Sequence, residues 1–227
     1  MEYKLEGRQL VSIHLKEGEK VFADPGKLVG KSSTVIMNPT MVGGIVNSLE
    51  RKFAGNAALL TEFEAKDGPG VVSFAGVLPG KTLGIELKEG EEFIAEHYAF
   101  LAAESGVTFT IQTVSMGAAF FGGAGLILQK FVGPGMVFIQ AVGDVVVYDL
   151  DGTHSFDADP GHIAGYDASV NFKIKFIDNV KSVLFAKEGI FLATFSGTGR
   201  VMLHSVSRFK LTLEVYREGQ SETKGKQ

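Results

Sequence analysis

The sequence predicts an all-β fold made of three similar β-sandwich-like units with one or two short helices. Three observations support this class. Glycine is abundant (29 of 227 residues), proline is scarce (6) and 45% of the chain is hydrophobic, which is typical of many short strands joined by turns. Apolar and polar side chains alternate, as at 172–176, where two lysines separate three apolar residues. A glycine-bearing segment also occurs three times.

The repeated segment is clearest at residues 125–140, where an apolar run ends at Gly133-Pro134-Gly135 and a second apolar run follows. Proline fixes φ and glycine accepts positive φ, so we interpret this segment as a hairpin of two strands and a tight turn. The pattern returns at 189–204, offset by 64 residues (197 − 133), and at 57–75, offset by 65 (133 − 68). Six glycines are therefore predicted to be structural turns: Gly68, Gly70, Gly133, Gly135, Gly197 and Gly199.

The repeats also predict the domain organisation. The chain is long enough for one large β unit or two small domains. Because periodic self-similarity fixes topology more firmly than local propensity, we expect a single unit over 1–216 with repeats at about 8–78, 79–143 and 144–216, followed by a polar tail at 217–227. Two columns stay apolar in all three repeats and predict core positions: Val72, Val137 and Val201, and Phe74, Ile139 and Leu203.

Taken in chain order, strands are predicted wherever apolar residues alternate or cluster between turn residues. These segments are 9–15, 21–22, 27–37, 57–63, 70–75, 81–87, 92–95, 100–103, 107–114, 125–131, 136–140, 145–150, 163–177, 189–204 and 206–215. A helix is predicted from Val42 to Gly55, because apolar residues there recur at i, i+3, i+4 and i+7. A shorter helix is predicted at 178–189, where Asp178 can cap the first turn and Gly189 can end the last.

In the middle repeat, the place of these helices is taken by residues 115–125, which are too rich in glycine for a helix and too apolar for a solvated loop. Met116, Phe120 and Phe121 stand there among small residues. An apolar patch on a soluble chain usually marks an interface or a membrane-facing surface. We therefore predict a subunit contact at these three residues. Burial in the chain's own core and peripheral membrane contact are the alternatives.

Composition excludes several classes of function. The chain has no cysteine, which removes disulfides, thiolate catalysis and cysteine-based metal centres and fits a reducing compartment. The N-terminal residues contain no apolar segment of the kind found in secretory signals, so we expect a cytoplasmic protein. A net charge of −4 gives no overall attraction for phosphate backbones, so no nucleic-acid partner is expected.

One cluster has the residue types of a metal site. Four side chains fall within nine positions: His154, Asp157, Asp159 and His162. Imidazole and carboxylate groups at short spacing suit a divalent metal. However, the sequence 159–161 matches 24–26, which no histidine follows, so turn chemistry explains the motif and we predict no metal and no cofactor. Nucleophile-elbow, zinc-protease and Walker motifs are absent from the sequence, so we also expect no catalytic activity.

With the repeats laid out, the chain resembles, over nearly its whole length, the family named for altered inheritance of mitochondria. The segments that carry the resemblance are 15–19, 100–103, 125–135, 161–165 and 189–201. The resemblance implies a fold like that of the tryptophan-RNA-binding attenuation protein, a double-stranded β-helix type of sandwich with three units per chain that assembles into rings. It implies no activity. Relatives typically have Gly-Gly-Glu before the middle apolar run, and this chain has Ala124-Gly125 there.

Two functions remain open. The first is a non-catalytic scaffold or partner-binding protein that forms a homo-oligomer, with a trimer favoured, because three like units leave unpaired sheet edges unless the sheet closes. A further protein partner is compatible with this role. The second is a small-ligand- or metal-binding β-sandwich protein of the cupin kind. RNA binding is not favoured, because equivalent positions of the repeats form no basic or aromatic stripe.

Overall fold

The computed structural model describes residues 1–40, 60–114, 125–177 and 190–224. Over these residues the chain is essentially all-β, which confirms the predicted class. The predicted helices at 42–55 and 178–189 lie outside the described residues. So do Met116, Phe120 and Phe121, and their predicted contact stays a prediction.

The elements follow one order three times: two strands, a short 3-10 helix and two strands, then further strand after an undescribed segment. The first stretch contains β2 (Leu10–Leu15), β3 (Lys20–Ala23), η1 (Pro25–Lys27), β4 (Leu28–Lys31), β5 (Val35–Thr40), β6 (Leu60–Ala65) and β7 (Gly70–Ala75), after an N-terminal β1 (Glu2–Glu6). The second contains β8 (Gly80–Leu87), β9 (Glu92–Glu96), η3 (His97–Ala99), β10 (Phe100–Glu104), β11 (Thr108–Val114), β12 (Leu126–Val132) and β13 (Gly135–Val142). The third contains β14 (Val145–Asp151), β15 (Phe156–Ala158), η5 (Pro160–His162), β16 (Ile163–Asp167), β17 (Val170–Ile177) and β18 (Ile190–His204), and α3 (Arg208–Lys224) ends the chain.

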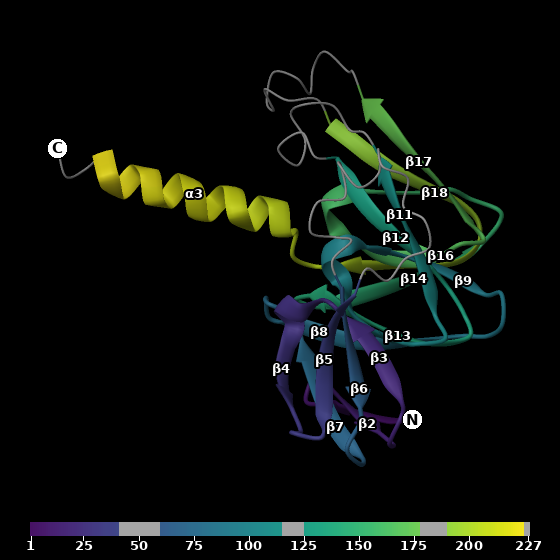
Figure 1. Ribbon diagram of the computed structural model, residues 1–227. Coiled ribbons are helices and arrows are strands. Elements are labelled where there is room, and N and C mark those ends of the chain that lie inside the picture. The colour runs from purple at the N-terminus through teal and green to yellow at the C-terminus, as the bar shows by residue number, and fades with distance from the viewer. Residues whose placement is uncertain (41–59, 115–124, 178–189, 225–227) are drawn as a thin grey trace.

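The strands form three sheets that are not closed into a barrel, and neighbouring stretches share sheets. The first sheet has the order β1-β2-β7-β4. The second, β5-β6-β3-β10-β13-β8, joins strands of the first and second stretches, and the third, β11-β12-β9-β16-β18-β14, joins the second and third. Strands β15 and β17 pair with β18 off this path. The first stretch lies at one end of the β-body and β17 and β18 lie at the other (Figure 1).

The predicted hairpins at 57–75 and 125–140 are wrong, because the strands on either side of the glycine turn belong to different sheets. Strand β12 pairs with β11 and β9, whereas β13 pairs with β8 and β10. Strands β6 and β7 are separated in the same way. Gly68 (φ 105°) and Gly135 (φ 136°) supply the positive φ that the bend requires. Glycine and proline specify a bend, but they do not specify whether the next strand returns to its predecessor.

In the third stretch the corresponding bend lies within one continuous strand. The N-terminal part of β18 pairs with β17 and β15, and its C-terminal part pairs with β14 and β16. Gly197 (φ 94°) and Gly199 (φ 142°) lie where the partners change. The six predicted turn glycines thus all lie at, or beside, a point where the chain changes its strand partners.

Three apolar clusters fill the spaces between successive layers. The middle cluster stacks aromatic rings from both six-stranded and eight-stranded sheets, with centroids 5.1 Å apart for Phe100 and Phe131 and 5.8 Å apart for Phe22 and Phe109. Five of the six predicted core residues are completely buried, and Leu203 is partly buried against the third cluster. The apolar columns of the sequence therefore locate the core.

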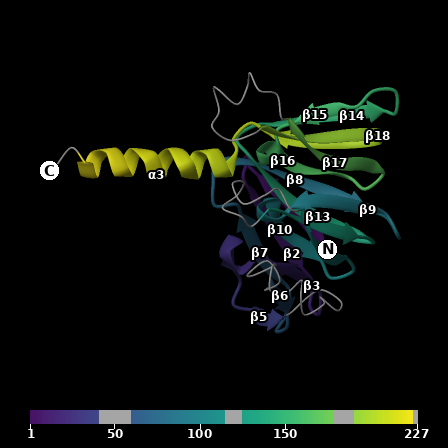
Figure 2. The same ribbon diagram turned by 90° about the horizontal axis from the view of Figure 1, so that it is seen from above.

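The C-terminus differs from the prediction. Residues 206–215 were expected to form a strand and 217–227 a polar tail, but β18 ends at His204 and α3 runs from Arg208 to Lys224. The hydroxyl of Ser207 accepts a hydrogen bond from the Lys210 backbone N–H (3.4 Å), as a helix-capping serine does. The alternating apolar residues of 209–215 suggested a strand, but α3 projects away from the sheets in both views (Figures 1 and 2). Within the described ranges, no helix is both long and apolar enough to span a membrane.

Candidate functional site

Two strands have an unpaired edge that their counterparts lack. Strands β3 and β9 each precede a 3-10 helix and pair on both sides, with β6 and β10 and with β12 and β16. Strand β15 precedes η5 in the same way, but it pairs only with β18. Likewise, β10 and β16 pair on both sides, whereas β4 pairs only with β7. Among the described residues, the edges of β15 and β4 are therefore free for a further strand.

Apolar side chains are also less buried on the two strands that have an unpaired edge. Leu101 and Ala164 are the second residues of β10 and β16, and both are completely buried. Val29 is the second residue of β4 and is 57% exposed. Phe93 lies four residues before the start of η3 and is completely buried. Phe156 lies four residues before the start of η5 and is only partly buried. The apolar side chains at both free edges thus lack the cover that a neighbouring strand gives elsewhere.

Two of the predicted metal candidates have other partners. The Nδ1 atom of His154 lies 2.7 Å from the Thr153 hydroxyl. The Asp157 carboxylate accepts a hydrogen bond from the Thr194 hydroxyl (2.5 Å) and lies 4.0 Å from the Lys175 ammonium. Across the part of the chain that the structure describes, no three His, Asp or Glu side chains are grouped closely enough to hold a metal ion.

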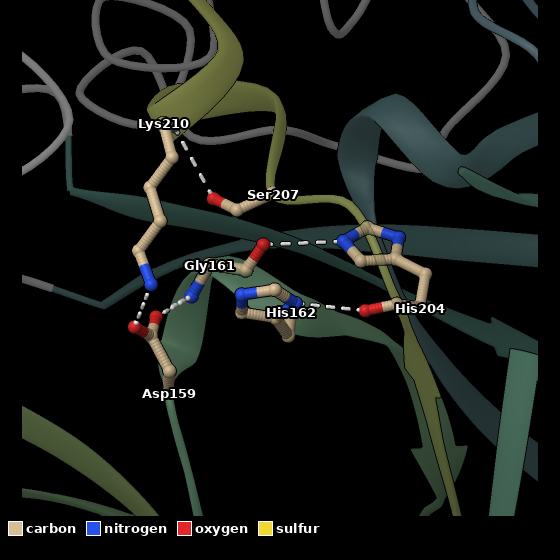
Figure 3. Close-up of polar contacts among 6 residues, drawn as sticks. All are labelled: Asp159, Gly161, His162, His204, Ser207 and Lys210. Carbon is tan, nitrogen blue, oxygen red and sulfur yellow. Dashed lines mark hydrogen bonds and ion pairs between the residues drawn. The ribbon is translucent and has the colours of Figure 1, made fainter. Parts of the chain in front are cut away.

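The other two candidates belong to a polar cluster at the base of α3 (Figure 3). Asp159 caps η5 by accepting a hydrogen bond from the Gly161 N–H (2.8 Å), and its second oxygen pairs with the Lys210 ammonium (2.8 Å). The Nδ1 atom of His162 donates to the His204 carbonyl oxygen at 2.8 Å. This cluster ties η5 to the end of β18 and to the first turn of α3, as turn chemistry predicts for Asp159.

A cavity of about 240 Å³ lies beside this cluster, between η3, η5, the start of β12 and the first turns of α3. Its apolar wall comes from Leu126, Ile127 and Ile163, and α3 closes it with Phe209 and Thr212. Two of the short helices border this space: η3 follows β9, and η5 follows β15 after Asp159.

Polar groups reach the same cavity from three elements. Glu96 precedes η3, His204 ends β18, and Arg208 begins α3 with its guanidinium carbon 4.6 Å from the centre of the Tyr98 ring. His204 is only 5% exposed. Its Nε2 atom lies 3.1 Å from the Gly161 carbonyl oxygen, and among the described residues no group is within hydrogen-bond distance of its buried Nδ1. His204 therefore has a buried ring nitrogen without a partner among the described residues.

Burial dominates the electrostatics around the cavity. It raises the pKa of Glu96 to about 7, against the opposing effect of Arg208 and Lys27. It lowers the pKa of the neighbouring His97 to about 4 and also lowers the pKa of His204. Lys27 is 5% exposed, its ammonium donates to the Tyr98 carbonyl oxygen at 3.2 Å, and burial lowers its pKa as well.

Comparison with known proteins decides the family. The family model described as mitochondrial biogenesis AIM24 matches residues 3–206. The chain belongs to the AIM24 family. An uncharacterised protein of Streptococcus pyogenes is 24% identical over 216 residues, which cover 91% of this chain and 86% of that protein. A crystal structure of a Streptococcus pyogenes protein is 22% identical, has a TM-score of 0.75, and covers 95% of this chain and 98% of its own, so it shows the shared fold.

The AIM24 match ends before α3. The sheets, the free edges and η5 lie inside the matched residues, whereas Arg208, Phe209 and Thr212 lie beyond them. The cavity is thus formed by the AIM24 fold on one side and by the C-terminal helix of this chain on the other.

Sequence reasoning missed Glu96, His204 and Arg208. Glu96 occupies the place of Asp24 and Asp159, which cap η1 and η5, and this correspondence could have drawn attention to it. His204 directly follows Leu203, so strand alternation places it on the opposite face and its burial was not predictable. The proximity of Arg208 was not predictable either, because it depends on the helical start of α3.

Proposed function

We propose that this AIM24-family protein is a non-catalytic scaffold that assembles from several copies of itself, with a trimer favoured, through the free edges of β4 and β15. The observation that carries the proposal is that each of these strands lacks a partner that its counterparts have. An unpaired edge presents a row of N–H and C=O groups and is a template for another strand. Figure 1 places β4 and the sheet containing β18, to which β15 pairs, at different ends of the molecule, so pairing joins two copies.

The proposed contact has a defined register. We treat the three stretches as structural repeats, so that the antiparallel pairs β3·β10 and β9·β16 serve as templates. Aligned on the ends of the 3-10 helices, these templates place three pairs across the contact: Ala158 and Gly30, Asp157 and Lys31, and Phe156 and Ser32. The central pair joins opposite charges, and such cross-strand pairs contribute about 0.2–1 kcal/mol.

The contact also accounts for the exposed apolar residues at the two edges. Val29 on β4 is 57% exposed although its counterparts are completely buried. A strand added beside β4 gives it the neighbour that covers Leu101 and Ala164 in the other two stretches. The edges differ from each other, so the contact is head to tail, and a closed ring leaves no edge of either kind unpaired.

Charge reversal tests this assembly. In light scattering at micromolar concentration, we expect a mass of three chains, about three times 24.3 kDa. Lys31→Glu and Asp157→Lys should each lower the mass towards that of one chain, because each opposes like charges across the contact. The double variant should restore it. Lys81→Glu, which reverses an exposed charge on the edge strand β8, is the matched control and should leave the mass unchanged.

Two results contradict the proposal. One is a wild-type protein that is monomeric at these concentrations. The other is an oligomer whose mass responds to Lys81→Glu as strongly as to Lys31→Glu, since the contact would then involve another edge. A cytoplasmic location and a further protein partner stay predictions from the sequence.

A further inference from the structure

We propose that the cavity beneath α3 binds a small carboxylic acid with an apolar body, and that Arg208 pairs with its carboxylate. This site is independent of the proposed assembly, because none of the cavity residues lies on β4 or β15. The proposal rests on the size and apolar wall of the cavity, on an arginine there that has no acidic partner among the described residues, and on the positive charge around it.

The cavity has room for a ligand of this kind. Its volume is about 240 Å³. An engineered apolar cavity of about 150 Å³ in another protein binds benzene, so this space accommodates an aromatic ring with a short substituent. Leu126, Ile127 and Ile163 supply the apolar wall, and ligand sites in proteins generally combine such a wall with a few polar groups that set orientation.

Arg208 is a charged group that a ligand in the cavity can reach. Its side chain is partly exposed, and it lines the cavity together with Thr212, which lies one helical turn further along the same face of α3. Its guanidinium carbon lies 4.6 Å from the centre of the Tyr98 ring, which also lines the cavity and belongs to a residue 51% exposed. The ring stabilises the positive charge, but it supplies no carboxylate oxygen to the guanidinium N–H donors.

Ion pairing distinguishes Arg208 from the other arginine side chains that the structure describes. Arg8 pairs with Asp144, and Arg200 forms a two-pronged pair with Asp167. Among the described residues, no carboxylate lies within ion-pair distance of Arg208. The planar fork of a guanidinium matches the two oxygens of a carboxylate, so an anion from outside the chain can supply the missing partner.

The charges around the cavity favour an anion over a cation. Arg208 and Lys27 are the cations that act on the Glu96 carboxyl group, and Asp24 offsets part of the charge of Lys27. Burial nevertheless raises the pKa of Glu96 to about 7, so this acid is largely protonated in mildly acidic solution and leaves the charge of Arg208 uncompensated. An ammonium ligand would be repelled by that charge, whereas a carboxylate neutralises it.

Glu96 makes the binding depend on pH. Its partly exposed side chain lines the cavity, so an anion beside Arg208 stabilises the protonated form of Glu96. The affinity for the carboxylate should therefore fall, by up to about tenfold per pH unit, as pH rises above about 7. The other titratable groups nearby are His97, His204 and His162, and burial lowers the pKa of the first two, so both are neutral in this range.

Four probes test the site: phenylacetate, phenylacetamide, phenethylamine and acetate. Binding to the full chain is followed by NMR titration at about pH 6, where Glu96 is largely protonated. Phenylacetate should bind about tenfold more tightly than phenylacetamide, the ratio that a charge-assisted hydrogen bond gives, and phenethylamine should bind more weakly than both. Acetate should bind more weakly than phenylacetate, because it has no apolar body to bury. Intermolecular NOEs should connect the phenyl protons to the methyl groups of Ile127 and Ile163.

Three variants assign the effect to named residues. Arg208→Gln keeps a polar side chain without the charge, so it should abolish the preference for phenylacetate over phenylacetamide. Glu96→Gln removes the titrating group, so the affinity for phenylacetate should no longer fall between about pH 6 and about pH 8. Lys210→Gln is the control, because it removes the same charge from the first turns of α3 at a residue that does not line the cavity, and it should keep the wild-type preference and pH dependence.

Five outcomes overturn the proposal. Two concern the wild type at about pH 6: phenylacetate does not bind, or phenylacetamide or phenethylamine binds as tightly as phenylacetate. Two concern the variants: the preference for phenylacetate survives Arg208→Gln, or the fall in affinity with pH survives Glu96→Gln. The fifth is that the phenyl protons show NOEs only to methyl groups outside the cavity.

Discussion

Replacing Glu96 by glutamine should change how stability depends on pH. The carboxyl group of Glu96 has a pKa of about 7 in the folded chain against 4.5 for an unperturbed glutamate, because burial disfavours its ionised form. Below the lower value both states hold the proton and the group has no effect. As pH rises from there to about 7, the unfolded chain loses a proton that the folded chain retains, so the free energy of unfolding falls.

The size of the effect follows from the two pKa values. Their difference, at about 1.36 kcal/mol per pH unit, gives a loss of about 3 kcal/mol that is complete above the folded pKa. Glutamine has a similar shape and no charge to bury. The Glu96→Gln variant should therefore be more stable than the wild type at about pH 8, by up to that amount, and close to it at about pH 4.

His97 makes the comparison sharper, because its contribution to the free energy of unfolding changes with pH in the opposite direction. Its pKa is about 4 in the folded chain against 6.5 unperturbed, so between these values the unfolded chain takes up a proton that the folded chain excludes, and stability rises with pH. In the wild type the two residues largely cancel over the range in which both titrate. In Glu96→Gln only the rise due to His97 remains.

Urea unfolding followed by circular dichroism measures these slopes at a fixed protein concentration. The chain has no tryptophan, so fluorescence is a weaker probe. Glu89→Gln, at an exposed turn position, is the control and should keep the wild-type profile. If the stability of Glu96→Gln between about pH 5 and about pH 8 instead follows the same nearly level profile as the wild type, the buried acid is another residue and the reasoning about Glu96 fails.

Three further predictions concern packing and capping. Ile139→Ala removes a completely buried side chain and should cost about 2–5 kcal/mol in urea unfolding, whereas Val147→Ala, at a residue 44% exposed, should cost far less. Gly165→Ala should destabilise by about 1–3 kcal/mol, because its new Cβ would lie 2.6 Å from Cζ of the buried Phe93; an unchanged midpoint would show that the ring can move aside. Asp159→Ala removes the cap of η5 and the partner of Lys210 and should cost about 0.5–2 kcal/mol, and Asp159→Asn, which retains the capping oxygen, should recover most of that loss.

The all-β class and the core were predictable because they depend on local pattern. The columns of Val72, Phe74 and their counterparts stay apolar along the sequence, and side-chain alternation fixes which face of a strand is buried. The same alternation misled at 209–215. There Ser207 caps a helix, and strand periodicity alone does not show whether a sheet edge is available to receive the segment.

The sheet pairing and the cavity were not predictable in this way, because both depend on contacts between distant segments. Nothing near Gly133 specifies that β13 pairs with β8 and β10 and not with β12. Similarly, Glu96 and His204 lie more than a hundred residues apart and meet only after η3 and η5 have turned the chain. The metal candidates show the opposite case. His154 and Asp157 are close in sequence, but each contacts a different residue.

Strand β18 connects the two regions discussed above by a single run of backbone. Its N-terminal part holds β15 through Ala193, Thr194 and Phe195, and its last residue, His204, forms part of the cavity wall. No loop separates the two parts, but the bend at Gly197 and Gly199 lies between them. Both glycines have positive φ values that other residues rarely adopt, so a side chain at either position would strain the point at which the strand changes its partners. These two glycines therefore let one strand serve both regions.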